Sequence, residues 1–189
     1  MKILKTQTLR GPNYWSIGYK KLIVMRLDLE DLAERPSNTI EGFYVGLGSI
    51  LPSLVDHYCS PGVRGGFLSR LKEGTMMGHI IEHVALALQT LAGMDSGFGR
   101  TRETATPGVY QVVFQYENEE AGRYAGRAAL RLCESIIETG TYPESELAQD
   151  FDDLNELRAA AALGPSTEAL VQEAEARNIP WLALPVRNL

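Results

Sequence analysis

The residues best suited to chemistry are two histidines and a glutamate in one short motif, HIIEH at positions 79–83. On an α-helix, residues three or four positions apart lie on the same face, so His79, Glu82 and His83 are expected to lie together. Two imidazoles one turn apart can bind a single zinc ion, and the carboxylate between them can accept a proton from a water molecule on the metal. The motif therefore predicts a zinc site with His79 and His83 as ligands and Glu82 as the general base.

The order H-x-x-E-H is typical of the inverzincin metallopeptidases. A catalytic zinc ion needs a third protein ligand, and in that class a glutamate from a later helix provides it. We expect Glu120 in this role, because it lies near the apolar edge of its helix, with Glu119 and Glu134 as alternatives. His57 is a further possible ligand, although each of these residues could equally be a solvated surface group.

A structural role for the two histidines is the main alternative. Buried histidines commonly form hydrogen bonds with backbone carbonyls or with a neighbouring carboxylate, here Glu82. The segment 78–92 that carries the motif is apolar around almost its whole circumference, which predicts a buried helix. Burying an unpaired charge costs several kcal/mol, and a divalent cation would remove that cost, so burial favours the metal site.

A glycine-rich stretch, 93–108, follows this helix and contains Arg100 and Arg102. It lacks the spacing of a phosphate-binding loop. Two arginines on a flexible, exposed loop can bind a carboxylate of the substrate through bidentate hydrogen bonds. They can equally pair with the chain's own excess of acidic residues, and the sequence leaves both interpretations open.

The elements that must position these residues can be located by their apolar patterns. Strands are expected over 2–10, 21–28 and 109–116, where β-branched and aromatic residues are frequent. Helices are expected over 42–57, 78–92, 118 to about 138 with Asn118 as the N-cap, 144–162, and 167–177 with Ser166 as the cap; a last strand is expected over 179–184. This order predicts an α+β fold, in which a small mixed or antiparallel sheet packs against several helices, one of them buried and carrying HxxEH.

Composition excludes several classes of protein. The chain has 189 residues, 44% of them hydrophobic and 22% charged, which is typical of a globular domain. Its net charge of −6 argues against broad binding to nucleic acid or an anionic membrane. The two cysteines, Cys59 and Cys133, form no CxxC motif, so we expect neither a disulfide scaffold nor a zinc ribbon. With no signal peptide and no long apolar run, a cytoplasmic protein is expected.

Several segments of the chain also resemble one known family. They are RGPNYWS at 10–16, GHIIEHVAL at 78–86, LAGMD at 91–95, GFGRTRE at 97–103 and GPST at 164–167. Together they resemble the N-terminal region of the cyanobacterial cyanophycin synthetases, over nearly the whole chain. Residues 119–122 match the family pattern, whereas Glu134 lies where that family is not expected to require an acid, and 184–189 depart from it.

The resemblance implies an ATP-dependent ligase that builds a storage polymer with an aspartate backbone and arginine on each side-chain carboxylate. Residues 1–162 would be its N-terminal domain and 163–189 the truncated start of an ATP-grasp domain, so the ligase active sites would lie outside this chain. The N-terminal domain would bind cyanophycin and contribute to a homo-oligomeric synthetase together with the remaining domains. In some members it would also cleave the polymer to make primers, an activity that would map to His79, Glu82 and His83.

Two functions are therefore expected from the sequence. The first is a zinc-dependent hydrolase of an aspartate and arginine polymer, in which Arg100 and Arg102 bind substrate. The second is a non-catalytic module that binds the polymer and supports assembly, in which the same residues are structural.

Overall fold

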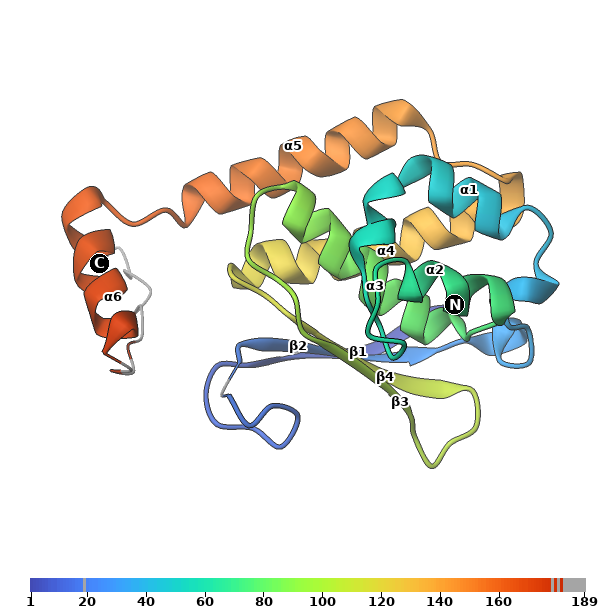
Figure 1. Ribbon diagram of the computed structural model, residues 1–189, viewed down its shortest axis with the longest axis horizontal. Helices are drawn as coiled ribbons and strands as arrows, with labels where there is room; N and C mark the ends of the chain where they lie inside the picture. The colour runs from blue at the N-terminus through green and yellow to red at the C-terminus, as the bar shows by residue number, and fades with distance from the viewer. Residues whose placement is uncertain (19, 178, 180, 182–189) are drawn as a thin grey trace. The chain divides into compact units, whose positions relative to one another are not determined.

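The computed structural model describes residues 1–18, 20–177, 179 and 181 (Figure 1). The chain divides into two compact units, Met1–Arg158 and Ala159–Leu189. In the second unit the described residues contain one helix, α6 (Pro165–Ala176), close to the expected 167–177. The strand expected over 179–184 lies outside the described residues, apart from 179 and 181. Among the described residues, no helix has the length and apolar character needed to cross a membrane.

The first unit is built on one four-stranded sheet. Its strands are β1 (Lys2–Leu9), β2 (Leu22–Asp28), β3 (Gly99–Glu103) and β4 (Val109–Gln115), in the order β1-β2-β4-β3. Every neighbouring pair is antiparallel. The expected α+β fold is confirmed, and of the two sheet types proposed the sheet is the antiparallel one.

The middle of the glycine-rich stretch is a strand rather than the expected exposed loop. Gly99 pairs with Phe114, and Arg102 pairs with Gln111. The segment lacks the alternation of apolar and polar residues that is typical of a strand. It forms an edge strand, and the residues on its inward side, Gly99 and Thr101, lie against the helix that contains Gly78 and Glu82. The strand forms because it pairs with β4, and such pairing with a distant segment cannot be read from the local sequence pattern.

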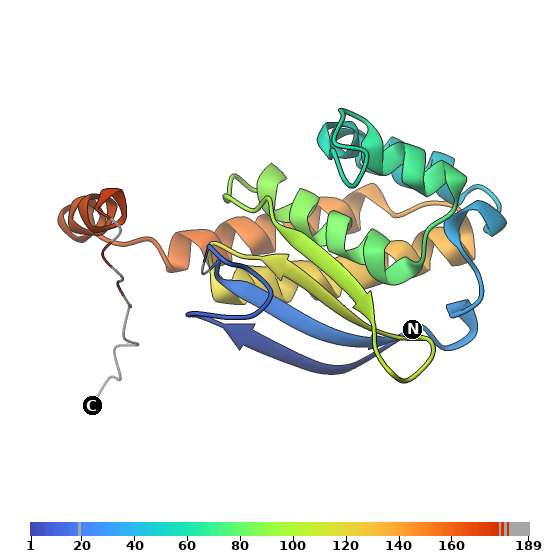
Figure 2. The same ribbon diagram turned by 60° about the horizontal axis from the view of Figure 1, so that its bottom comes forward.

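The helices of this unit lie on one face of the sheet (Figure 2). They are α1 (Phe43–Ile50), α2 (Gly66–Glu73), α3 (Met77–Leu91), α4 (Glu119–Thr139) and α5 (Glu144–Ala160), with 3-10 turns at Glu30–Leu32, Ser37–Thr39 and Pro52–Asp56. The expected helix 42–57 is divided at Leu51, because Pro52 begins a separate 3-10 turn. Helix α2 was not predicted from the sequence; it directly follows a cluster of glycines.

Helix α4 packs closely on the sheet and supports α3. A Cβ at Gly122 would lie 2.6 Å from Cβ of Tyr116, and one at Gly126 would lie 3.0 Å from Cζ of Phe114, so larger residues would push the helix away. Asn118 caps α4 as expected, because its side chain accepts a hydrogen bond from the backbone of Ala121 at 2.9 Å. Helix α3, which carries the HxxEH motif, is therefore held within a tightly packed core.

Candidate metal centre

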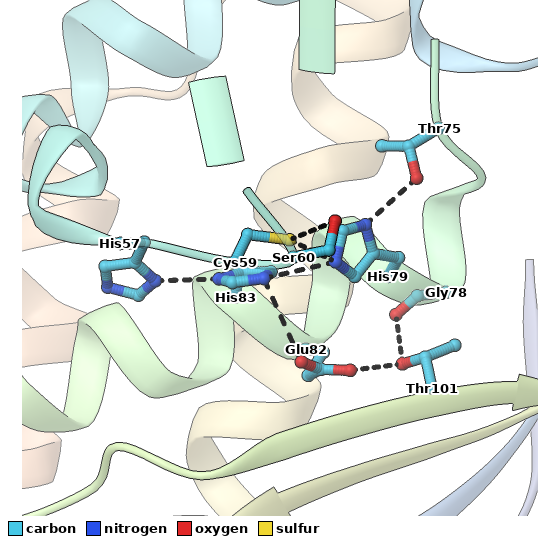
Figure 3. Close-up of polar contacts among 9 residues, drawn as sticks. All are labelled: His57, Cys59, Ser60, Thr75, Gly78, His79, Glu82, His83 and Thr101. Atoms are coloured by element: carbon cyan, nitrogen blue, oxygen red, sulfur yellow. Dashed lines mark hydrogen bonds and ion pairs between the residues drawn. The ribbon is translucent and has the colours of Figure 1, made fainter. Parts of the chain in front are cut away.

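Helix α3 places the HxxEH residues at one side of a cleft of about 1150 Å³. Glu82 and His83 are only 4% and 7% exposed, whereas His79 is partly exposed. The Nε2 atoms of His79 and His83 are 3.2 Å apart (Figure 3). The expected shared face is therefore present, with both imidazoles directed at one point.

Cys59 completes a group that could hold a metal ion. Its Sγ lies 3.3 Å from Nε2 of His79, and the ligand atoms of Cys59, His79 and His83 all lie within 4.8 Å of one another. In a tetrahedral zinc site with ordinary bond lengths, ligand atoms lie about 3.3–3.6 Å apart. The Cys59–His79 and His79–His83 separations are close to this range. Thiolate with imidazole is a donor set that suits zinc, so the residues present fit the ion.

The loop that carries Cys59 is closed by backbone contacts at both ends. The backbone of Phe67 donates a hydrogen bond to the carbonyl of His57 at 3.1 Å. A Cβ at Gly66 would lie 1.9 Å from the Tyr58 carbonyl oxygen, so only glycine allows this approach. Cys59 itself has a positive φ of 53°, a conformation that is uncommon for residues other than glycine and that is often found at functional sites.

Each histidine of the group has a partner for its second ring nitrogen. Nδ1 of His79 is 2.9 Å from Oγ1 of Thr75, and Nδ1 of His83 is 2.8 Å from Nδ1 of His57. Phe67 stacks on the His83 ring with centroids 4.1 Å apart. Among the described residues neither ring bonds to a backbone carbonyl, one of the two partners expected for structural histidines. The other expected partner, Glu82, has its Oε1 3.9 Å from Nε2 of His83. These contacts direct both Nε2 atoms to the common point, and His57 lies behind His83 rather than within the group.

Burial also keeps both histidines neutral. Desolvation, together with the charge of Arg70, lowers the pKa of His79 from 6.5 to about 4. Desolvation, with smaller effects of His79 and His57, lowers the pKa of His83 to about 2. A neutral imidazole has the free lone pair that a metal ion requires.

Glu82 lies beside this group without belonging to it. Its Oε2 accepts a hydrogen bond from Oγ1 of Thr101 at 2.7 Å, and its Oε1 is 3.9 Å from Nε2 of His83. Burial raises the pKa of Glu82 to about 7, against the opposing effects of the Thr101 hydrogen bond and the Arg100 charge. Gly99 packs directly against the carboxylate, since a Cβ there would lie 2.3 Å from Oε1.

The three glutamates considered as third ligands lie elsewhere. Glu119 pairs with Arg10 at 2.7 Å, Glu134 pairs with the α-amine of Met1 at 2.9 Å, and Glu120 is exposed in the first turn of α4. In the part of the chain that the structure describes, the group of Cys59, His79 and His83 is the one arrangement of such residues that could hold a metal. Cys59 therefore lies beside the two histidines, whereas Glu120 was expected there as the third ligand.

The two arginines of β3 have different surroundings. Arg100 lines the cleft, whereas the Arg102 guanidinium lies over the Trp15 ring, 5.9 Å from its centroid, and does not line the cleft. Arg70, on α2, also lines the cleft. No sequence pattern distinguished Arg70 or Cys59, because each reaches the site from a different element.

Comparison with known proteins relates this chain to one family. The family model of the cyanophycin synthase-like N-terminal domain matches residues 24–138, more than half of the chain. The chain belongs to this family. The matched range includes Cys59, the HxxEH motif and Arg100.

Curated relatives extend the similarity to all 189 residues. The chain is 74% identical to a cyanophycin synthetase of Crocosphaera subtropica, 70% identical to one of Synechocystis sp. and 71% identical to one of Nostoc sp.. It spans only 21–22% of the length of these proteins. This cyanophycin synthase-like domain therefore corresponds to about a fifth of each synthetase.

Proposed function

We propose that this domain is a zinc-dependent hydrolase that cleaves cyanophycin and so supplies short primers for polymerisation. The observation that carries the proposal is the juxtaposition of Cys59, His79 and His83 with a buried carboxylate, Glu82, in one cleft. Three protein ligands with room for a fourth group are typical of catalytic rather than structural zinc sites.

The ligand roles follow from the contacts of each side chain. His79 and His83 would bind zinc through Nε2, because Nδ1 of each faces Thr75 or His57. Cys59 would supply the third ligand in place of Glu120. Zinc supplies Lewis acidity, which polarises a carbonyl and makes a nearby water molecule easier to deprotonate.

Glu82 would move the proton. Thr101 donates to Oε2, which leaves Oε1, the oxygen facing His83, free to accept a proton from the attacking water. The water oxygen forms the new bond to the carbonyl carbon, the carbon–nitrogen bond breaks, and Glu82 returns the proton to the leaving amine. A pKa near 7 suits a group that acts first as base and then as acid.

The cleft suits a charged polymer. Its volume of about 1150 Å³ slightly exceeds that of ordinary ligand sites, which typically measure about 300–1,000 Å³. Arg70 and Arg100 line it and could pair with carboxylates of the substrate. An arginine joined through its α-amine to an aspartate side chain keeps a free carboxylate, so each unit of cyanophycin offers one.

The larger context belongs to the same proposal. The relatives are named cyanophycin synthetases, and this chain spans 22% of their length. We therefore propose that the domain acts within an ATP-dependent ligase and that residues 163–189 begin its ATP-grasp domain. We also propose that the full-length enzyme is a homo-oligomer and that this domain contributes to its assembly together with the remaining domains.

Glu82→Gln tests the function directly. The substitution keeps the volume of the side chain and all three zinc ligands, so metal content measured by mass spectrometry should not change. Cleavage of cyanophycin should fall about 10²–10⁴-fold, the usual contribution of a general acid–base group. Glu120→Gln, on the exposed start of α4, is the matched control and should leave both quantities unchanged.

Two results would reject the hydrolase. Wild-type cleavage by Glu82→Gln would remove Glu82 from the mechanism. Purified wild-type protein that holds no zinc and releases no fragments, yet still binds the polymer, would favour the non-catalytic binding and assembly module instead.

A further inference from the structure

The cleft that holds the candidate metal group carries charges of both signs. Among the described residues that line it, the cations are Arg70 and Arg100. The acids are Asp56 and Glu82. Glu82 is buried and accepts a hydrogen bond from Thr101, whereas Asp56 is exposed. Asp56 is therefore the acid of the cleft whose charge a ligand can reach directly.

Asp56 and Arg70 lie beside different histidines of this site. Burial lowers the pKa of His57, and the charge of the neighbouring Asp56 opposes this effect. The charge of Arg70 acts instead on His79. The ring of His83 lies between the other two, with its centroid 5.1 Å from that of His57 and 4.8 Å from that of His79 (Figure 3). Negative and positive charge thus flank the candidate metal group on different sides.

The Asp56 carboxylate has capacity for a further partner. Within the described part of the chain its one hydrogen bond comes from Nε of Arg64, which donates to Oδ1 at 2.8 Å. The two side chains are 63% and 64% exposed, and ion pairs between such exposed groups are weak. A guanidinium with two parallel donors can occupy both oxygens of a carboxylate. A ligand that binds in this way can therefore displace Arg64.

The pair of Arg64 and Asp56 is not the main closure of the loop that carries Cys59. The amide of Gly65, the residue after Arg64, donates a hydrogen bond to the carbonyl of Val55, the residue before Asp56, at 2.6 Å. The backbone therefore holds the two ends of the loop together without the ion pair. What the ion pair shows is that the carboxylate accepts a guanidinium at the edge of the cleft.

We propose that Asp56 is a specificity-determining residue that binds the guanidinium of a substrate arginine, while Arg70 or Arg100 binds a free carboxylate. The inference rests on the proposed function and names the part of the substrate that the cleft recognises. Each unit of cyanophycin carries one guanidinium and one free carboxylate, so a site with charges of one sign would match only half of it. The substrate guanidinium displaces Arg64 and takes its place on Asp56.

A neutral analogue of arginine tests this assignment. Citrulline has nearly the same size and shape as arginine, but an uncharged urea group replaces the guanidinium. Polymer segments of the same length are prepared with arginine or with citrulline on every aspartate. Their dissociation constants are measured with the Glu82→Gln protein as the parent, so that neither segment is cut. The parent should bind the arginine segment about 5- to 30-fold more tightly, the usual effect of one partly exposed, hydrogen-bonded ion pair.

Two variants of the parent separate recognition of the substrate from closure of the loop. Asp56→Asn should bind both segments about equally, with the affinity that the parent has for the citrulline segment. Arg64→Gln breaks the same ion pair but removes a competitor, so it should bind the arginine segment at least as tightly as the parent does. Asp152→Asn, an exposed acid on α5 that does not line the cleft, is the matched control for net charge and should discriminate as the parent does.

Several results would overturn the proposal. They are equal binding of the two segments by the parent, no binding of the arginine segment by the parent, or full discrimination by Asp56→Asn. Loss of discrimination in Arg64→Gln to the same extent as in Asp56→Asn would show that the ion pair only shapes the loop. If the segments bind as expected but the wild-type protein never cleaves the polymer, only the hydrolase is lost and the recognition by Asp56 stands.

Discussion

Gly99→Ala offers a sharp test of the position of Glu82. A Cβ at residue 99 would lie 2.3 Å from Oε1 of Glu82 and 2.6 Å from its Cγ and Cδ. Ordinary carbon contacts begin near 3.5 Å, so the carboxylate must move by about 1 Å. That movement would lengthen the 2.7 Å hydrogen bond from Thr101 and displace the proposed base from the zinc ligands.

The expected effects on rate and on stability differ in size. A displacement of about 1 Å at a reacting group can cost about 10²-fold in rate. The free energy of unfolding should fall by only about 1–2 kcal/mol, because the weakened hydrogen bond is offset in part by the lower chain entropy of alanine. Zinc affinity should be unchanged, since Glu82 is not among the three proposed ligands.

The assay combines three measurements: polymer cleavage, zinc affinity by chelator competition, and urea unfolding. Gly97→Ala is the matched control, because a Cβ there would have no neighbour within 4 Å. Cleavage by Gly99→Ala at the wild-type rate would refute the reasoning about the Glu82 position. Loss of zinc from Gly99→Ala alone would instead make Glu82 a ligand.

Two further substitutions separate the ligands from the residues behind them. Cys59→Ala should weaken zinc binding by more than about 100-fold, because loss of a ligand costs more than loss of a residue that only orients a ligand. Cys133→Ala, on the buried side of α4, is the control and should not change zinc affinity. Equal zinc affinity in the two cysteine variants would contradict the ligand assignment. His57→Ala should weaken zinc binding about 10- to 100-fold, because it removes the partner that orients His83. Ser53→Ala, in the same cleft, is the control and should leave zinc affinity unchanged. An unchanged affinity in His57→Ala would show that this contact does not orient the ligand.

Local patterns in the sequence predicted the features that depend on neighbours along the chain. The apolar circumference of 78–92 predicted the buried helix α3, and the spacing of His79, Glu82 and His83 predicted their shared face. Asn118 was correctly expected to cap α4. These features follow from helical periodicity and from hydrogen bonds between residues three or four positions apart, so they need no knowledge of the rest of the fold.

Contacts between distant segments were decided only by the tertiary structure. Cys59 reaches His79 because a loop closed by Gly66 and Phe67 folds over α3, and no spacing rule links a loop cysteine to a helix twenty residues later. Strand β3 exists because β4 pairs with it, although its own residues lack an apolar pattern. Antiparallel register then places Lys5 beside Arg26, although twenty residues of chain separate them. The sequence by itself determined that His79, Glu82 and His83 share one face of a helix. The approach of Cys59 and the surrounding charges depend on pairings that only the folded chain brings into contact.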